Sequence, residues 1–195
     1  MRKERTLVII KPDGVQRGLI GDIITRFEKM GLKLVGTKMI IPTKDLARKH
    51  YTMEDDWVEN VGKKTIEAGG DRMKDKDPIE EGEKILSNIT GYITSGPVVV
   101  MVWQGVHAVE MVRKMVGGTE PRTSDVGTIR GDYVLDSYEI ADEDGRAVRN
   151  IIHASSATSE ADNEINLWFD KSEVMDYKLV QDIILYDTNL DGLVE

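Results

Sequence analysis

Short β-branched apolar runs alternate along this chain with stretches whose apolar residues lie three and four positions apart. The runs predict strands, and they occupy residues 6–10, 32–41 and 97–103. The last run is apolar without interruption after its proline, which is typical of a central strand buried on both faces. The helical spacing predicts helices at residues 20–30, 43–51 and 106–115. The pattern therefore predicts a domain that mixes strands with helices.

The long segment after the predicted helix at residues 43–51 breaks this regular pattern. Residues 54–92 are rich in charge and glycine, with Met73-Lys74-Asp75-Lys76-Asp77-Pro78 in their middle. Weak helical spacing occurs at residues 57–68 and 79–89. We interpret the segment as an elaborated surface insertion that is partly helical.

Two further strands are predicted near the other end of the chain, at residues 133–140 and 147–152, joined by a hairpin turn at Asp142-Glu143-Asp144-Gly145. The whole chain is then a single domain, residues 1–195, with an insertion at about 54–92 and an extended hairpin at about 136–146. The predicted fold class is α/β (α+β), a ferredoxin-like sandwich. It has a mainly antiparallel sheet of about four strands covered by helices.

The stretch from Val148 to Phe169 carries the most chemistry. Its apolar residues Ile151 and Ile152 predict the end of a strand, and His153 follows directly. A helix is predicted after it, with several possible N-cap residues, namely Ser155, Ser156, Thr158 and Ser159. A histidine at a helix N-terminus can meet an anion, because free N–H groups point toward it. A lone histidine, however, is usually one that merely packs.

The overall charge limits the classes of partner. The 195 residues carry a formal net charge of −9, with a pI near 5.0. General nucleic-acid binding and binding to anionic membranes both need a basic face, so neither is expected. There is no cysteine, which is compatible with a reducing compartment. No apolar run is long enough for a signal sequence or a membrane span, so we expect a cytoplasmic protein.

Common ligand motifs are missing from the sequence. It has neither a P-loop nor a dinucleotide-binding glycine motif, and it lacks the histidine and cysteine clusters of zinc sites. The hexapeptide from Asp187 to Gly192 matches the first half of a calcium loop. The glutamate that such a loop requires would fall beyond Glu195, so a solvated acidic tail is the better interpretation. No metal site is predicted from protein side chains.

Several cations lie at the ends of predicted core elements. They are Lys11, Arg113, Arg122, Arg130 and Arg149. In so acidic a chain they could converge on a phosphate-bearing ligand, which arginine binds through its two-pronged guanidinium. The alternative is that each pairs with a surface carboxylate. An imidazole can attack phosphorus. His153 is therefore a candidate nucleophile, with Glu164 on the following helix as acceptor for its second nitrogen. His50 and His107 look weaker.

These residues lie in ordered blocks that resemble the nucleoside diphosphate kinase family over most of the chain. The blocks include the N-terminal Lys11-Pro12-Asp13-Gly14-Val15-Gln16-Arg17-Gly18 and the later Arg149-Asn150-Ile151-Ile152-His153, both highly specific. Between and after them lie His50-Tyr51, Ser95 to Trp103, Arg113 to Pro121, Gly127 to Asp132 and Glu164 to Phe169.

The resemblance implies an enzyme that transfers the terminal phosphate of a nucleoside triphosphate to a nucleoside diphosphate through a phosphohistidine on His153. Ser155 and Glu164 would orient or support that histidine. Mg²⁺ would arrive bound to the nucleotide phosphates, and the protein would form a homo-oligomer, a hexamer or tetramer, with Pro121 in an intersubunit loop. The resemblance also implies contacts to phosphates and sugar from Lys11, Tyr51, Arg113, Thr119, Arg130 and Asn150.

Some positions depart from the family pattern. Ala154 and Ser156 replace a glycine and an aspartate after the histidine, and the insertion lies where the family places an aromatic ring against the base. Trp57 is a candidate for that ring. These departures motivate an alternative, a catalytically weakened nucleotide-binding regulator on the same scaffold. A nucleic-acid-binding ferredoxin-like module is a more distant alternative, given the acidic balance.

Overall fold

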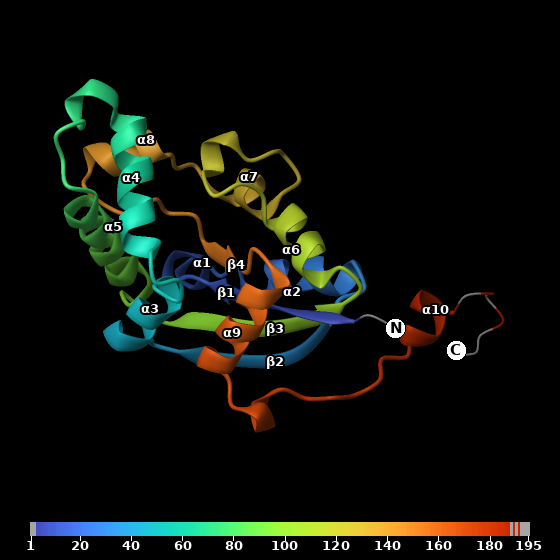
Figure 1. Cartoon of the computed structure of the whole chain (residues 1–195). Coiled ribbons are helices and arrows are strands. Elements are labelled where there is room, and N and C mark those ends of the chain that lie inside the picture. Colours follow the sequence, from blue (N-terminus) through green and yellow to red (C-terminus); the bar gives the residue numbers. More distant parts are fainter. Residues whose placement is uncertain (1–2, 188, 190, 192–195) are drawn as a thin grey trace.

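The computed structural model describes residues 3–187, 189 and 191. In this part of the chain one sheet is formed by β1 (Glu4–Ile10), β2 (Lys33–Ile40), β3 (Val98–Gly105) and β4 (Ile152–Ala154). The strand order is β2-β3-β1-β4, and all neighbours are antiparallel. The predicted antiparallel sheet of about four strands is confirmed (Figure 1).

Helices cover both faces of this sheet. On one face α2 (Ile20–Lys29) and α6 (Ala108–Val116) pack through Phe27 and Val112 against Trp103 of β3 and its neighbours. On the other face α3 (Lys44–Tyr51) and α9 (Thr158–Trp168) pack against apolar residues such as Val100. Val98 to Trp103 are all buried, as the uninterrupted apolar run predicts. The double covering explains that run, since neither face of β3 meets water.

The first loop of the chain differs from its prediction. Lys11-Pro12-Asp13-Gly14 reads as a turn, but Pro12 begins a short helix, α1 (Pro12–Gln16). Proline suits the first helical position, because its fixed φ is helical and its missing N–H would have no partner there. Lys11 thus becomes the N-cap residue at the junction of β1 and α1.

The extended hairpin predicted at about 136–146 is wrong. After η2 (Pro121–Thr123) and α7 (Ile129–Tyr133) the chain forms α8 (Tyr138–Glu143). Ser137 is the N-cap of α8, and its hydroxyl accepts a hydrogen bond from the Ile140 N–H at 3.3 Å. Arg146 then binds Asp136 at 2.7 Å and closes the segment on itself. The capping interaction outweighs the weak strand pattern, and β4 starts only at Ile152.

The insertion folds as two packed helices, α4 (Trp57–Gly69) and α5 (Pro78–Ile93), joined through η1 (Gly70–Arg72). The two predicted helices are confirmed, and both run further than expected. Figure 1 shows the pair rising side by side from one end of the sheet. A Cβ at Gly62 would lie only 1.8 Å from the Pro78 carbonyl oxygen, so the close approach of α4 and α5 requires glycine there.

The segment after α9 runs along the open edge of β2. It contains η3 (Lys171–Glu173) and α10 (Asp182–Leu185), and the Met175 N–H donates to the Val35 carbonyl at 2.6 Å. Lys3 pairs with Asp182 at 3.7 Å, which brings the two ends of the described chain together (Figure 1). The half-matching calcium loop lies partly outside the described residues. Within them, no helix is both long and apolar enough to cross a membrane.

Candidate active site

Strand β4 places His153 opposite Ile9 of β1. The residue two positions earlier, Ile151, has a φ of 51°, a conformation that costs a β-branched residue about 1–3 kcal/mol. The surroundings hold it there, because its side chain is fully buried and its carbonyl accepts a 2.7 Å hydrogen bond from the Lys11 N–H. The strained residue thus stands directly before β4, the strand that carries His153.

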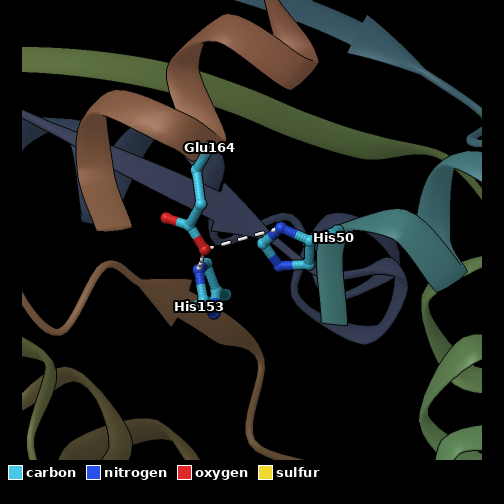
Figure 2. Close-up of side chains that lie close together, drawn as sticks. All are labelled: His50, His153 and Glu164. Carbon is cyan, nitrogen blue, oxygen red and sulfur yellow. Dashed lines mark hydrogen bonds and ion pairs between the residues drawn. The ribbon is translucent and has the colours of Figure 1, made fainter. Parts of the chain in front are cut away.

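His153 is paired with Glu164 of α9, as predicted. Its Nε2 lies 2.6 Å from Glu164 Oε1 (Figure 2). The Ser155 hydroxyl donates to Glu164 Oε2 at 2.5 Å. Ser155 is itself held by a 3.1 Å hydrogen bond from the Leu7 N–H. Because a carboxylate only accepts, Nε2 of the neutral ring carries its proton and Nδ1 keeps the lone pair.

The ionisation of this pair follows from its burial. Burial and, next, the positive charge of Lys11 lower the pKa of His153, so the imidazole is neutral at pH 7. Burial also raises the pKa of Glu164, against the opposing effects of His50 and of the hydrogen bond from Ser155. A neutral imidazole with a free lone pair can act as a nucleophile.

The helix after the histidine begins differently from its prediction. The N-cap of α9 is Ala157, which has no side-chain capping bond, so none of the four predicted hydroxyl residues caps it. Ser155 binds Glu164 instead, and the Ser156 N–H donates to the Glu160 side chain. A carboxylate from the first helical turn thus binds the backbone just before the helix, and no side chain caps the first turn.

Lys11 is held by hydrogen bonds close enough to His153 for its charge to affect that histidine. Its Nζ donates to Asn150 Oδ1 at 2.6 Å, and Asn150 Nδ2 donates to the Thr119 carbonyl at 3.0 Å. Lys11 is 8% exposed. Burial, and then the charge of Arg130, lower the pKa of Lys11 to about 7. An anion placed here would meet a poorly solvated cation, which strengthens their attraction.

Arg130 of α7 lies in the same cluster but binds only backbone carbonyls. It donates to the carbonyls of Gly117 and Gly118 at 3.0 and 2.8 Å, and to that of Ile152 at 2.6 Å. Burial, and then the charge of Arg113, lower the pKa of Arg130 to about 10. Arg113 itself is exposed, with its guanidinium 3.5 Å from the Ala154 carbonyl. Three of the five predicted cations, Lys11, Arg113 and Arg130, therefore converge around β4, and Arg130 is the more buried of the two arginines.

The remaining candidates have separate places. Arg122 binds Glu139 at 2.6 Å, so the interpretation as a surface ion pair holds for it. The Arg149 guanidinium lies 4.6 Å from the centroid of the Tyr92 ring. His107 is the N-cap residue of α6. These three therefore make no described contact with His153.

His50 was underrated from the sequence. It is 5% exposed, its Nδ1 lies 3.5 Å from Glu164 Oε1, and its ring meets the His153 ring edge-on at 4.6 Å. Burial, and then the charge of His153, lower the pKa of His50 to about 3. Trp168 donates to His50 Nδ1 at 3.2 Å. The available signal was the His50-Tyr51 block of the family resemblance, since no local spacing points from α9 to His50.

His50, His153 and Glu164 offer three ligand atoms within 4.8 Å of one another (Figure 2). Mg²⁺ prefers oxygen ligands, and this group offers two ring nitrogens beside a single carboxylate. The Nε2–Oε1 distance of 2.6 Å is that of a hydrogen bond, and His50 Nδ1 already accepts from Trp168. The group fits a hydrogen-bonded array and does not fit a resident magnesium site.

A cleft of about 740 Å³ opens on His153 between α4 and the first turns of α9. Tyr51 and Trp57 line it, with their ring centroids 6.2 Å apart. Burial raises the pKa of Tyr51, whose hydroxyl has no hydrogen-bond partner among the described residues. Lys11 and the arginines are not among the residues that line this cleft. His153 therefore lies between an aromatic cleft and a cluster of cations.

The comparisons with known proteins agree with this geometry. A family model described as nucleoside diphosphate kinase matches residues 4–59 and 61–174. The chain belongs to the nucleoside diphosphate kinase family. A nucleoside diphosphate kinase from Pyrobaculum aerophilum is 46% identical over 183 residues, which cover 90% of this chain and all of the relative. One from Pyrococcus furiosus is 48% identical over 174 residues, 89% of this chain and 88% of the relative.

Solved structures of the family share the fold. The P. aerophilum crystal structure has a TM-score of 0.84 at 45% identity, and covers 90% of this chain and 100% of its own. A Borrelia burgdorferi nucleoside diphosphate kinase, a transition-state mimic with bound vanadate and ADP, has a TM-score of 0.78 at 37% identity. It covers 93% of this chain and 96% of its own. The chain is accordingly a phosphotransferase that acts on nucleoside di- and triphosphates.

Proposed function

We propose that His153 carries the phosphoryl group in a two-step transfer, with Nδ1 as the attacking atom. Nδ1 attacks the terminal phosphorus, the bond from phosphorus to the bridging oxygen breaks, and the diphosphate leaves with that electron pair. A terminal oxygen of a second nucleoside diphosphate then attacks the phosphohistidine, and the ring leaves as a neutral imidazole. The observation that carries this proposal is the 2.6 Å contact of Nε2 with Glu164, which leaves Nδ1 as the nucleophilic nitrogen.

The cluster around β4 would neutralise the transferring group. In phosphoryl transfer, charge develops on the phosphate oxygens, and fixed cations and donors stabilise it. We assign this role to Lys11 and Arg113. Arg130 and Asn150 are assigned two roles, to hold the surrounding backbone and to contact the phosphates. Thr119 and Tyr51 are assigned to phosphate and sugar contacts, and Trp57 to stacking against the base. The burial of Lys11 supports this role, because a bound phosphate would stabilise the ammonium charge in place of the water that burial removes.

Magnesium would enter as part of the substrate. Mg²⁺ usually keeps several waters and binds through substrate phosphates. The lack of fit between the His50, His153 and Glu164 group and a magnesium ion supports this assignment. Removal of free Mg²⁺ with a chelator is then expected to abolish turnover while leaving the fold unchanged.

The regulator reading is the weaker candidate. It rests on the long segment 54–92 and on Ala154, whose methyl group would disfavour a positive φ beside the nucleophile. Ala154 lies within β4 and pairs with Val8, and the positive φ belongs to Ile151 instead. The residue beside His153 is therefore compatible with the extended backbone that the nucleophile needs.

We further propose a cytoplasmic homo-oligomer, a hexamer or tetramer. Almost fully exposed apolar side chains support assembly, among them Val126 in the loop before α7 and Leu135 after it, at 93% and 106% exposure. Exposed apolar side chains on both sides of α7 favour contact with another subunit. Light scattering that gave a monomeric mass would contradict this part of the proposal.

The experiment that tests the function uses ATP labelled on its terminal phosphate. The protein is incubated with Mg²⁺ and labelled ATP, freed of nucleotide, and then given GDP. Label that stays on the protein, moves quantitatively to GTP, and is absent from His153→Asn supports the proposal. ATP binding without retained label would favour the regulator. The His107→Asn variant is the matched control, since His107 lies outside the cluster and should label normally.

A further inference from the structure

A buried contact between α3 and α9 lies directly behind the pair of His153 and Glu164. The indole Nε1 of Trp168, the last residue of α9, is 3.2 Å from His50 Nδ1, near the end of α3. The two rings meet edge-on at 5.5 Å. Trp168 is 3% exposed and His50 5%, so little water reaches the two rings.

The chemistry of the two rings fixes where the protons lie. An indole N–H can only donate, so His50 Nδ1 has to be the acceptor. A neutral His50 then carries its proton on Nε2. That Nε2 is buried and has no hydrogen-bond partner among the described residues, which normally costs about 1–3 kcal/mol. The ring is thus held in the tautomer that satisfies fewer of its own hydrogen bonds.

The other tautomer would have an attractive acceptor within reach. His50 Nδ1 lies 3.5 Å from Glu164 Oε1, the oxygen that accepts from His153 Nε2. A proton on Nδ1 would turn His50 into a charge-assisted donor to that oxygen. It would compete with His153 for the carboxylate, and His153 would then be free to place its own proton on Nδ1, where it blocks attack on phosphorus.

We propose that Trp168 is a positioning residue whose indole N–H holds His50 as the Nε2–H tautomer and thereby reserves Glu164 Oε1 for His153. The proposal rests on the role assigned to His153 above. The ring centroids of His50 and His153 are 4.6 Å apart, so both histidines could bind Glu164. The indole N–H of Trp168, on the same helix as Glu164, prevents His50 from doing so.

Removal of the N–H alone should therefore slow the first half-reaction. In Trp168→Phe the aromatic packing largely remains, but His50 can adopt the Nδ1–H tautomer, losing the proton from Nε2 and gaining one on Nδ1 by exchange with solvent, and can then bind Glu164. The rate of phosphohistidine formation should fall about tenfold, the share expected when one charge-assisted hydrogen bond is partly lost. The fall should appear in kcat with little change in the KM for ATP, because no nucleotide contact is altered.

A second substitution separates this role from simple packing. His50→Leu removes the competing donor, so in that background Trp168→Phe should cost nothing further. Trp168→Phe alone should be about tenfold slower than the wild type, whereas the double variant should match His50→Leu, whatever the rate of that single variant. If the Phe variant fails to fold, benzothienylalanine at position 168 keeps the ring shape and replaces the N–H with sulfur.

The closing experiment reads the tautomer directly by 15N NMR on histidine-labelled protein, which contains three histidines. We expect His50 to show a protonated Nε2 in the wild type and a protonated Nδ1 in Trp168→Phe, together with a double variant that reacts at the rate of His50→Leu. A protonated Nδ1 in the wild type, or an equal loss of rate from Trp168→Phe in both backgrounds, would overturn the proposal. A wild type that never labels His153 would refute the proposed function, whereas the tautomer result would still stand by itself.

Discussion

Replacement of Lys11 by methionine should weaken catalysis and at the same time stabilise the folded protein. Burial lowers the pKa of Lys11 from 10.5 to about 7. At about 1.36 kcal/mol per pKa unit, the folded state loses roughly 5 kcal/mol by holding this charge at pH 7 or below. Methionine removes the cost of the buried charge, but it leaves Asn150 Oδ1 without the donor at 2.6 Å, which costs about 1–3 kcal/mol. A net gain of about 2–4 kcal/mol in unfolding free energy is expected.

The pH dependence gives the sign of this effect. Below pH 7 Lys11 is protonated in both states, so the penalty is complete and constant. Between about pH 7 and 10.5 the unfolded chain binds a proton that the folded protein does not, so wild-type stability rises with pH. The advantage of Lys11→Met should therefore shrink across that window.

Urea unfolding of both proteins from pH 6 to 10 measures the difference. Lys178→Met, at an exposed lysine outside the helices and strands, is the matched control and should show no such trend. In the same samples, phosphohistidine formation by Lys11→Met should fall at least a hundredfold, because a charge-stabilising contact to the phosphate is lost. A Lys11→Met protein that is less stable than the wild type at pH 6 would refute the reasoning.

Three further predictions concern the same cluster. Glu164→Gln keeps the shape but loses the charged acceptor, so phosphohistidine formation measured by rapid quench should slow about 10–100-fold; an unchanged rate would contradict the pairing with His153. Arg130→Lys cannot reach the carbonyls that Arg130 binds, so thermal unfolding should show a loss of about 2–4 kcal/mol; an unchanged melting temperature would contradict it. Because the pKa of His153 is lowered, the nucleophile stays neutral as pH falls through 6.5, and kcat/KM should keep its value to below pH 6; a loss of activity with a midpoint at 6.5 that is absent from ATP binding would argue against this environment.

Much of the fold follows from apolar periodicity. The uninterrupted run at Val98 predicts the central strand because both of its faces are covered, and helical spacing locates α2 and α6 because each buries one stripe. The pairing of His153 with Glu164 was also predictable, since Glu164 lies on the inward face of the helix that follows the histidine.

Other features depend on contacts that local patterns do not contain. The helix α8 replaces a predicted strand because Ser137 caps it and Arg146 ties its end to Asp136, and neither effect appears in hydrophobic alternation. The positive φ of Ile151 opposes the preference of its own side chain and exists only because the surrounding core and Lys11 hold it.

The place of His50 shows the same limit at the site. It precedes Trp168 by more than a hundred positions, and α3 and α9 meet only because both cover the same face of the sheet. A sequence pattern identifies each helix but not which side chains cross between them. Burial then changes the chemistry of the histidine, because a buried ring has to match its few neighbours.

The most direct test of the account is to identify the nitrogen of His153 that becomes phosphorylated. Protein labelled from ATP in the presence of Mg²⁺ is digested under alkaline conditions, and the phosphohistidine isomer is assigned by 31P NMR against both authentic isomers. Because Glu164 binds Nε2 at 2.6 Å, we expect phosphorylation on Nδ1 of His153 alone. Phosphate on Nε2, or on any residue other than His153, would contradict it.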